Sequence, residues 1–337
     1  MNDVTTPALA RWPSYLKPSD EGTHPVQNTP LWSENYLTQI YAPEAKIGFW
    51  FHFGRASFDP TLWNEVFVAY LPGDKYLVSG SYSYGDGPTG PTGNQLHYRC
   101  NNPYEQWTKS FRGAANLVTG EQLRAGPHVT GTHILVDAEL TWDSLGPAFD
   151  LGPLSSNETW SKAHYEQHGR VRGYITYDGK RVELVGSGIR DHSWGPRDLS
   201  RFNYHVWMSG QFPDGRTFMV FHIVDDKGHS GTHALLGDTN GVRPATLESK
   251  PPLITDASQV MDGYEMVFTT ASGERAEIRA TILQAPPISF GGASELLFGC
   301  HRPVGGTHWL YESQTCFEWD GQVGYGLTDR TVNMKNR

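Results

Sequence analysis

The regular spacing of turn residues constrains the fold of this chain more than any other feature. Between residues 47 and 329, apolar or alternating runs recur at intervals of roughly 8–14 residues, with turns between them. Examples of these turns are Pro72-Gly73-Asp74, Pro213-Asp214-Gly215 and Asn240-Gly241. No long segment has the period of an amphipathic helix. Short strands joined by such turns are typical of β-barrels and β-sandwiches, so we expect an all-β fold.

The clearest alternation in the first half lies in residues 132–142. One face of this run carries apolar side chains only, namely Ile134, Val136, Ala138, Leu140 and Trp142. The other face carries His133, Asp137, Glu139 and Thr141. A period of two with one apolar face predicts a half-buried antiparallel strand.

A hairpin signal follows at Asp178-Gly179, which separates two alternating runs. Asp-Gly suits a type I′ turn because both central positions need a positive φ. If Tyr177 pairs with Lys180, Glu166 lies opposite Asp191. The neighbouring pairs in this register are Gln167 with Arg190 and Tyr165 with His192.

The 337 residues are enough for one large domain or two domains of ordinary size. A weak internal repeat favours two domains, because the strand-like run that contains His52 resembles the run that contains His205 about half a chain later. We therefore expect an irregular lead-in over residues 1–44, with at most a short helix at Leu31–Gln39. Two tandem barrels follow over residues 45–155 and 156–337, and an exchange of strands between them is left open.

Composition argues against several classes of protein. The formal net charge is −9 and no Lys/Arg run stands out, so we expect no nucleic-acid partner. The first ten residues lack the features of a signal peptide, and no apolar run is long enough to span a membrane. We expect a cytoplasmic protein without stable membrane insertion, and a homodimer is left open. The three cysteines form no Cys-x-x-Cys pair and are expected to be buried thiols.

The densest group of chemically active residues lies within Gly186–Asp198. Strand alternation places Arg190, His192 and Trp194 on one face, and Asp191 and Ser193 on the other. An imidazole beside an indole in a cavity suits acid–base work on an alkene-rich molecule. The alternative interpretation is structural: a core tryptophan packed beside a hydrogen-bonded histidine.

The predicted pairing of Glu166 with Asp191 has its own consequence. Two carboxylates directly opposite each other repel unless they share a proton or a cation. In an apolar cavity, one of them would have a raised pKa and could act as a general acid. The alternative is a surface ion cluster with Arg170 and Arg172.

The remaining histidines carry weaker signals. His222 lies on the apolar face of the run 217–224, where a lone histidine is as a rule a core residue rather than a catalyst. His52 and His205 invite the same caution. His164-x-x-x-His168 would suit a metal only on a helix with a third ligand, and His-Glu-x-x-His is absent. We expect neither a metal nor a cofactor.

The motif Asp191-His192-Ser193-Trp194-Gly195 resembles the Asp-His-x-Trp-Gly signature of carotenoid 1,2-hydratase and AttH-like proteins. The longer form with Arg190 and Arg197 is similar to an uncharacterised bacterial branch of that group. The resemblance implies two tandem lipocalin-like β-barrels, and it implies that His192 and Trp194 line the active cavity. Carotenoid hydratases also use a Tyr-x-Asp on a later strand, where this chain has Phe221-His222-Ile223. His222, Asp191 or Glu166 would then have to donate the proton.

These observations predict a cofactor-independent hydratase, dehydratase or double-bond isomerase that acts on a hydrophobic terpenoid- or steroid-like molecule in a barrel cavity. The alternatives are a non-catalytic lipocalin-like carrier and a cyclase or pericyclase that templates ring formation. The candidate catalytic residues are Asp191, His192, Glu166 and His222. The candidate substrate-contacting residues are Trp194, Arg190, Tyr165, His52, Trp50 and Trp207.

Overall fold

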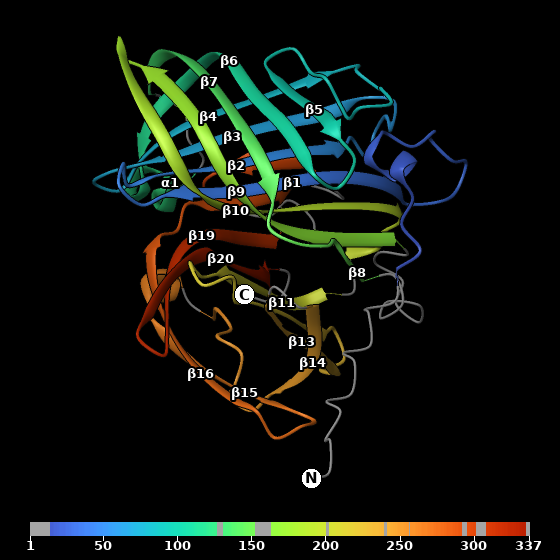
Figure 1. Cartoon of the computed structure of the whole chain (residues 1–337). Helices are drawn as coiled ribbons and strands as arrows, with labels where there is room; N and C mark the ends of the chain where they lie inside the picture. Colours follow the sequence, from blue (N-terminus) through green and yellow to red (C-terminus); the bar gives the residue numbers. More distant parts are fainter. Residues whose placement is uncertain are drawn as a thin grey trace.

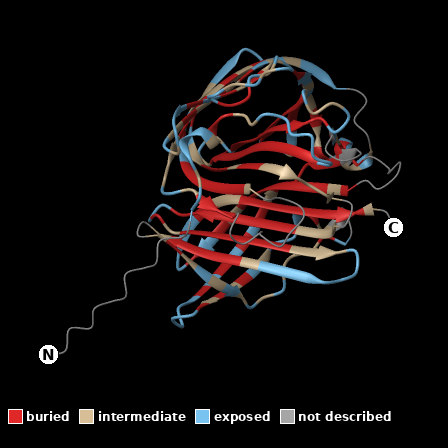
Figure 2. Cartoon of the chain, turned by 90° about the vertical axis from the view of Figure 1, so that its right-hand side faces the viewer, coloured by how far each residue is buried: buried red, intermediate tan, exposed pale blue. Residues whose placement is uncertain are grey.

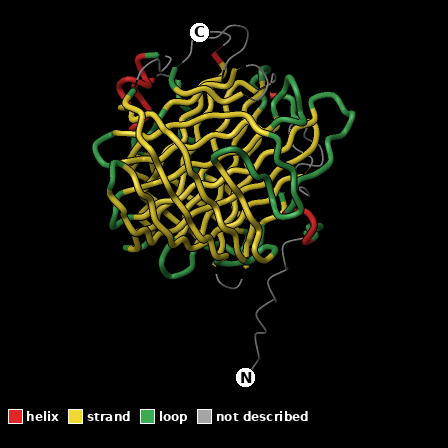
Figure 3. The backbone as a smooth tube through the Cα atoms, turned by 90° about the horizontal axis from the view of Figure 1, so that it is seen from above, coloured by secondary structure: helices red, strands yellow, loops and turns green. Residues whose placement is uncertain are grey.

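The computed structural model of the chain is built almost entirely of antiparallel β-strands (Figure 3). It describes residues 14–126, 131–151, 163–199, 202–238, 241–255, 257–291, 295–300 and 308–334. Two sheets stack on each other (Figure 1). The expected all-β fold with tandem barrels is confirmed.

The first sheet closes into a barrel in the order β10-β1-β2-β3-β4-β6-β7-β9, because β9 also pairs with β10. Its strands are β1 (Trp32–Ala42), β2 (Ile47–Arg55), β3 (Trp63–Leu71), β4 (Lys75–Ser83), β6 (Gln106–Thr119), β7 (Thr132–Ser144), β9 (Ala163–Tyr177) and β10 (Lys180–Pro196). Two short strands attach to it, β5 (Leu96–Asn102) on β6 and β8 (Phe149–Asp150) on β9.

The second sheet runs in the order β16-β15-β14-β13-β12-β11-β20-β19 and closes through a pairing of β16 with β19. Its strands are β11 (Phe202–Gln211), β12 (Thr217–Asp225), β13 (Ser230–Asp238), β14 (Gly241–Leu247), β15 (Tyr264–Thr270), β16 (Arg275–Gln284), β19 (His308–Trp319) and β20 (Gln322–Asn333). β17 (Pro287–Gly291) pairs with β19, and β18 (Glu295–Phe298) extends from β17. The helical segments are η1 (Pro18–Glu21), α1 (Gly120–Ala125) and η3 (Ala257–Met261). None of the described helices has the length and apolar character needed to cross a membrane.

The hairpin at Asp178-Gly179 forms as predicted, with φ angles of 48° and 69° at the two turn residues. The register is confirmed, because Tyr177 pairs with Lys180 and Glu166 pairs with Asp191. The alternation in residues 132–142 is also confirmed, since Val136, Ala138, Leu140 and Trp142 are buried in the first barrel. Local turn chemistry and a strict period of two therefore predicted these elements correctly.

The motif-bearing strand β10 belongs to the first barrel and not to the second. It pairs with β1 on one side and with β9 on the other, and β9 continues into β7. The expected division at 155/156 lies outside the described residues. The difference arises because the first barrel closes only when its last hairpin, β9–β10, pairs with β1. Neither the spacing of turns nor local alternation reveals this pairing.

Strand β1 lies where an irregular segment and a short helix were expected, and the helix prediction is wrong. The strand escapes sequence analysis because both of its faces are buried while many of its side chains are polar. Ser33, Glu34, Asn35, Thr38 and Gln39 are all buried. Such a strand shows no apolar–polar alternation, and its polar groups are satisfied by partners far away in the sequence.

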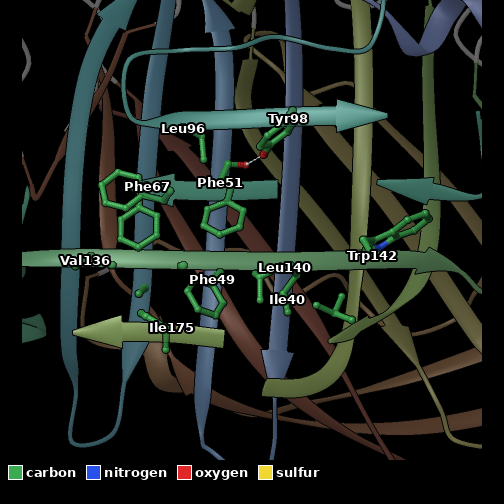
Figure 4. Packing of buried hydrophobic residues seen from close by; sticks show 14 of the residues in the cluster. Ile40, Phe49, Phe51, Phe67, Leu96, Tyr98, Val136, Leu140, Trp142 and Ile175 are labelled. Carbon is green, nitrogen blue, oxygen red and sulfur yellow. Dashed lines mark hydrogen bonds between the residues drawn. The ribbon is translucent and has the colours of Figure 1, made fainter. Parts of the chain in front are cut away.

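Packed side chains fill both barrels. The interior of the first contains Phe49, Phe51, Phe67, Leu140 and Trp142 (Figure 4), and the second has its own apolar core. A further apolar cluster joins the two sheets, with Leu37 and Trp50 from one side and Trp207 and Leu310 from the other. The strands that meet there are largely buried (Figure 2). The interface between the barrels therefore forms a third core.

Candidate active site between the barrels

A cavity of about 90 Å³ lies in the interface between the two barrels. Its apolar wall consists of Leu37, Trp50, Leu199, Trp207, Phe221, Leu296 and Leu310. Its polar lining consists of Ser33, Asn35, His52, His164, Asp191, Arg197, His205, Glu312 and Asp329. Both sheets contribute to each set, so the cavity exists only where the two barrels meet.

Strand alternation decides which side chains reach this cavity. On β10, Asp191 points to the cavity, whereas His192 points into the first barrel. On β2, Trp50 and His52 line the cavity, while the phenylalanines that alternate with them (49, 51 and 53) fill the barrel. Gly54 makes room for this arrangement, because a Cβ there would lie 2.7 Å from Cε1 of His52.

Asp191 is the ionised acid of the cavity. Its Oδ1 accepts a hydrogen bond of 3.1 Å from the backbone N–H of Leu37, and its Oδ2 lies 3.5 Å from Nε2 of His164. Burial alone would raise the pKa of Asp191. The interaction with His164 and the charge of Arg197 outweigh burial and hold the pKa below its ordinary value. Asp191 therefore carries a negative charge at neutral pH.

Glu166 lies directly behind Asp191, and its pKa is shifted in the opposite direction. Its side chain is fully buried, and Oε2 accepts a hydrogen bond of 3.1 Å from the indole N–H of Trp207. Burial and the nearby charge of Asp191 raise the pKa of Glu166 well above its ordinary value. The two facing carboxyl groups thus differ in protonation, as two close carboxyl groups must when no cation separates them.

A second pair of acids comes from the other barrel. Glu312 on β19 lies directly opposite Asp329 on β20. Burial, followed by the charges of Asp329 and Asp191, raises the pKa of Glu312 well above its ordinary value. Burial also raises the pKa of Asp329, to about 8. Sequence analysis did not identify this pair, although the Asp320-Gly321 turn supplies the same register argument as Asp178-Gly179: if Trp319 pairs with Gln322, Glu312 lies opposite Asp329.

Two histidines of the cavity are neutral. The ring of His52 stacks on Trp50 with centroids 5.4 Å apart, and burial lowers the pKa of His52 to about 4. Nδ1 of His205 lies 3.7 Å from Oδ2 of Asp329. Burial, with the charge of Arg197 second, lowers the pKa of His205 to about 3. Both rings are therefore weak bases here, and at neutral pH they can take part in hydrogen bonds but do not hold a second proton.

The histidine of the motif holds the N-terminal segment against the first barrel. Nε2 of His192 lies 3.0 Å from Oε1 of Glu34, and the ring stacks on Tyr36 with centroids 3.7 Å apart. Nδ1 of His24 lies 2.9 Å from the same Glu34 oxygen, and the His24 ring stacks on Trp194. His192 and Trp194 therefore contact protein groups from residues 24–36 and do not line the cavity.

Arg190 and Tyr165 form a second buried network around Glu21. Nη2 of Arg190 donates to both carboxylate oxygens of Glu21, at 2.9 and 3.0 Å, and the Tyr165 hydroxyl donates to the same carboxylate. Burial alone would raise the pKa of Glu21, but Arg190 and these hydrogen bonds lower it. Glu21 lies in the expected lead-in, so sequence analysis had no signal for this partner.

A model of the family described as "Domain of unknown function (DUF7064)" matches residues 17–334. The chain belongs to the DUF7064 family. No curated protein matches its sequence.

Three solved structures share the fold of this DUF7064 protein. A candidate AttH from Nitrosomonas europaea is 18% identical, with a TM-score of 0.59, over 96% of this chain and 99% of that one. CghA with Sch210972 is 15% identical, with a TM-score of 0.55, over 94% and 96% of the two chains. Kievitone hydratase from Nectria haematococca is 11% identical, with a TM-score of 0.53, over 94% and 93%. At these identities the likeness concerns the fold.

The ten candidate residues of the DUF7064 protein fall into three places. Asp191, His52, Trp50 and Trp207 line the cavity, and Glu166 lies behind it. Arg190, Tyr165, His192 and Trp194 belong to the networks of the first barrel. His222 lies on the Phe218 face of β12, where its Nδ1 is 2.8 Å from Oγ1 of Thr232. The cavity is thus shared between the two barrels. The sequence analysis had instead expected a cavity inside a single barrel.

Among the residues that the structure of this DUF7064 protein describes, two clusters bring potential metal ligands within 4.8 Å of one another. In the first, His24 and His192 already bond to Glu34, which Arg55 also contacts at 3.2 Å. The second consists of His164, Glu166 and Asp191 beside the cavity. The positive charge of Arg197 acts on Asp191 there and opposes a further cation. That a reaction at this site proceeds without a metal ion remains a prediction.

Proposed function

We propose that this protein is a cofactor-independent enzyme that moves protons on a hydrophobic small molecule in the cavity between the barrels. The reaction is the addition or removal of water or the shift of a double bond. Terpenoid- and steroid-like molecules are the proposed substrate class. They exceed the cavity's volume of about 90 Å³, so only the reacting end of such a molecule would enter it. The protein would therefore be a hydro-lyase or an isomerase.

One observation carries this proposal: the cavity holds carboxyl groups of opposite protonation at neutral pH. Asp191 is ionised, whereas Glu312 and Asp329 have raised pKa values. Environments that push the pKa values of neighbouring acids apart are a signature of paired base and acid catalysts. Asp191 is the proposed base and Asp329, supported by Glu312, the proposed acid.

The steps balance without an external reactant. In dehydration, Asp191 takes a proton from a substrate carbon and the C–H electron pair becomes the new double bond. The leaving hydroxyl takes a proton from Asp329 and departs as water. Exchange with solvent then removes the proton from Asp191 and returns one to Asp329. Hydration is the reverse, and isomerisation returns the proton to another carbon.

The lining supports an apolar substrate. Trp50, Trp207 and Phe221 with four leucines form the apolar part of the wall, and Asp191 and Asp329 are among the polar groups that complete it. Such a division orients an apolar molecule by a few polar contacts. A fold shared with a protein named as a hydratase is compatible with this chemistry, although the likeness itself concerns architecture.

The test is incubation with a panel of terpenoid and steroid alcohols and enones in H₂¹⁸O and in D₂O, followed by mass spectrometry. A hydro-lyase incorporates ¹⁸O, an isomerase incorporates deuterium only, and a carrier returns the ligand unchanged. A template for ring closure changes the product without incorporating either label.

The matched variants are Asp191→Asn and the surface control Glu265→Gln, whose side chain is exposed. Loss of the base should lower turnover about 10²–10⁴-fold, while the control keeps wild-type turnover. The chelator EDTA should change neither. Full turnover in Asp191→Asn, or loss with EDTA that zinc or manganese restores, would contradict the proposal.

A further inference from the structure

Arg197 lies between the cavity and an outer pocket. The outer pocket has a volume of about 390 Å³ and is lined by residues 27–33, by Arg55, Ser57 and Pro60, and by Arg197. Ser33 and Arg197 line both spaces. The backbone N–H of Arg197 donates to the carbonyl of Leu31 at 2.8 Å, which fixes the chain at this point. A molecule that spans both spaces must pass the guanidinium group.

The guanidinium of Arg197 has a buried N–H donor without a hydrogen-bond acceptor. Its Nε is buried without a hydrogen bond, and no carboxylate oxygen of the described residues lies within 4.0 Å of the group. The buried Arg190, in contrast, is held by both oxygens of Glu21. Arg197 is half-buried as a residue, and a buried N–H donor without an acceptor, such as its Nε, is unfavourable. A ligand oxygen would supply the missing acceptor.

We propose that Arg197 binds the carbonyl oxygen of the substrate, and that the substrate is a neutral β-hydroxy or α,β-unsaturated carbonyl compound. This inference rests on the proposed function, because it places the carbon that Asp191 deprotonates next to that carbonyl. The C–H electron pair then forms the enolate double bond, and the carbonyl π pair moves onto the oxygen beside Arg197. When the β-hydroxyl leaves with the proton from Asp329, the enolate collapses to the conjugated carbonyl.

Charge in the cavity favours a neutral carbonyl over a carboxylate. Arg197 contributes one positive charge and Asp191 one negative charge, so the two balance before the substrate enters. Proton transfer to Asp191 moves the negative charge onto the enolate oxygen and preserves the balance. A permanent carboxylate would add a second negative charge beside Asp191, Glu312 and Asp329. Fixed charge placed where negative charge develops is the usual origin of enolate stabilisation.

Three aromatic probes test the inference: 2-naphthol, whose ionised form mimics an enolate, naphthalene, which lacks the oxygen, and 2-naphthoate, which is a permanent carboxylate. Binding is measured by fluorescence, and the absorption of bound 2-naphthol reports its ionisation. The wild type should bind 2-naphthol at least about tenfold more tightly than naphthalene, and its absorption should show a larger ionised fraction than in water at the same pH. Arg197→Gln should abolish both effects, and the exposed control Arg279→Gln should keep them.

The outcomes separate this inference from the proposed function. Equal affinities for 2-naphthol and naphthalene in the wild type, with turnover intact, overturn the role of Arg197 and leave the proposed function standing. Tighter, Arg197-dependent binding of 2-naphthoate overturns the neutral carbonyl class. Failure of all three probes to bind counts against both proposals. Should Arg197→Gln fail to fold, the ionised fraction in the wild type and in Arg197→Lys decides the question.

Discussion

At the scale of single residues, the neighbours of a carboxyl group matter more than its identity. Asp191 and Asp329 are both aspartates in one cavity, yet the pKa of the first is lowered and that of the second is raised to about 8. Burial by itself raises both pKa values. At Asp191 the interaction with His164 and the charge of Arg197 outweigh it, whereas at Asp329 burial and the charge of Asp191 outweigh Thr331 and Arg197. The same residue type therefore becomes a base on one wall and an acid on the opposite wall.

Asp329 makes stability depend on pH in a direction that can be measured. Its carboxyl keeps its proton up to about pH 8 in the folded protein but loses it above about pH 4 in the unfolded chain. Stability from this group is complete below about pH 4 and is lost as the pH rises toward 8, by at most about 1.4 kcal/mol per pH unit. Asparagine is neutral in both states, so the stability of Asp329→Asn relative to the wild type should increase from pH 5 to pH 8.

Urea unfolding of both proteins at pH 5, 6.5 and 8 measures this difference. Glu265→Gln, whose side chain is exposed, serves as the control and should follow the wild type. A constant difference between Asp329→Asn and the wild type across the three pH values would contradict a raised pKa at this position.

Sequence analysis could identify some of these residues but not their roles. Asp191 and Glu166 were found because a hairpin register depends only on a local turn. Glu312 and Asp329 face each other across the Asp320-Gly321 hairpin, so the register argument used at Asp178-Gly179 would have found them too. Glu21 and Glu34 were missed because their partners Arg190 and His192 are distant in the sequence. A pKa depends on such distant partners, so it follows from tertiary structure alone.

At the scale of elements, β10 has two faces with different tasks. Asp191 faces the cavity, and Arg190 and His192 secure the segment that contains η1 and β1. Alternation predicted this division from the sequence. It did not predict which face met the cavity, because that depends on which barrel the strand closes.

Removing His192 should therefore affect stability more than catalysis. His192→Ala removes the hydrogen bond to Glu34 and the stacking on Tyr36, and it leaves a buried carboxylate with fewer donors. We expect a loss of about 2–4 kcal/mol in unfolding free energy and less than about a tenfold change in kcat for the folded fraction. Urea unfolding and turnover measure the two effects.

The exposed His133→Ala, on β7, is the matched control and should change neither quantity. A His192→Ala protein with wild-type stability and a hundredfold loss of kcat would instead place this histidine in the reaction, as the resemblance to carotenoid hydratases implies.

At the scale of the whole molecule, hydrogen bonds tie the barrels together around the cavity. The Tyr70 hydroxyl on β3 donates to the backbone carbonyl of Glu312 at 2.8 Å, and Nε2 of His168 lies 2.7 Å from Oγ of Ser209. With the apolar cluster between the sheets, these contacts make the interface resemble a domain core. Local sequence patterns predicted most of the strands but not β1, and they carry no information about how two closed sheets dock.

Tyr70→Phe tests whether the barrels unfold together. The variant loses one hydrogen bond between the barrels, worth about 1 kcal/mol, and it should still unfold in a single transition seen alike by tryptophan fluorescence and far-UV circular dichroism. Tyr98→Phe, which loses a bond within the first barrel to the Phe51 carbonyl, is the matched control. Two separate transitions in Tyr70→Phe would show that the interface is not a shared core.

The position of the cavity also limits how the substrate specificity of such a protein can evolve. Because each barrel is packed solid and supplies only one wall of the cavity, neither barrel transplanted alone into another chain would carry the site with it. A new specificity must instead arise from paired changes on the two facing sheets. The residues of the lining are thus expected to co-vary across the interface, while the two interiors drift independently.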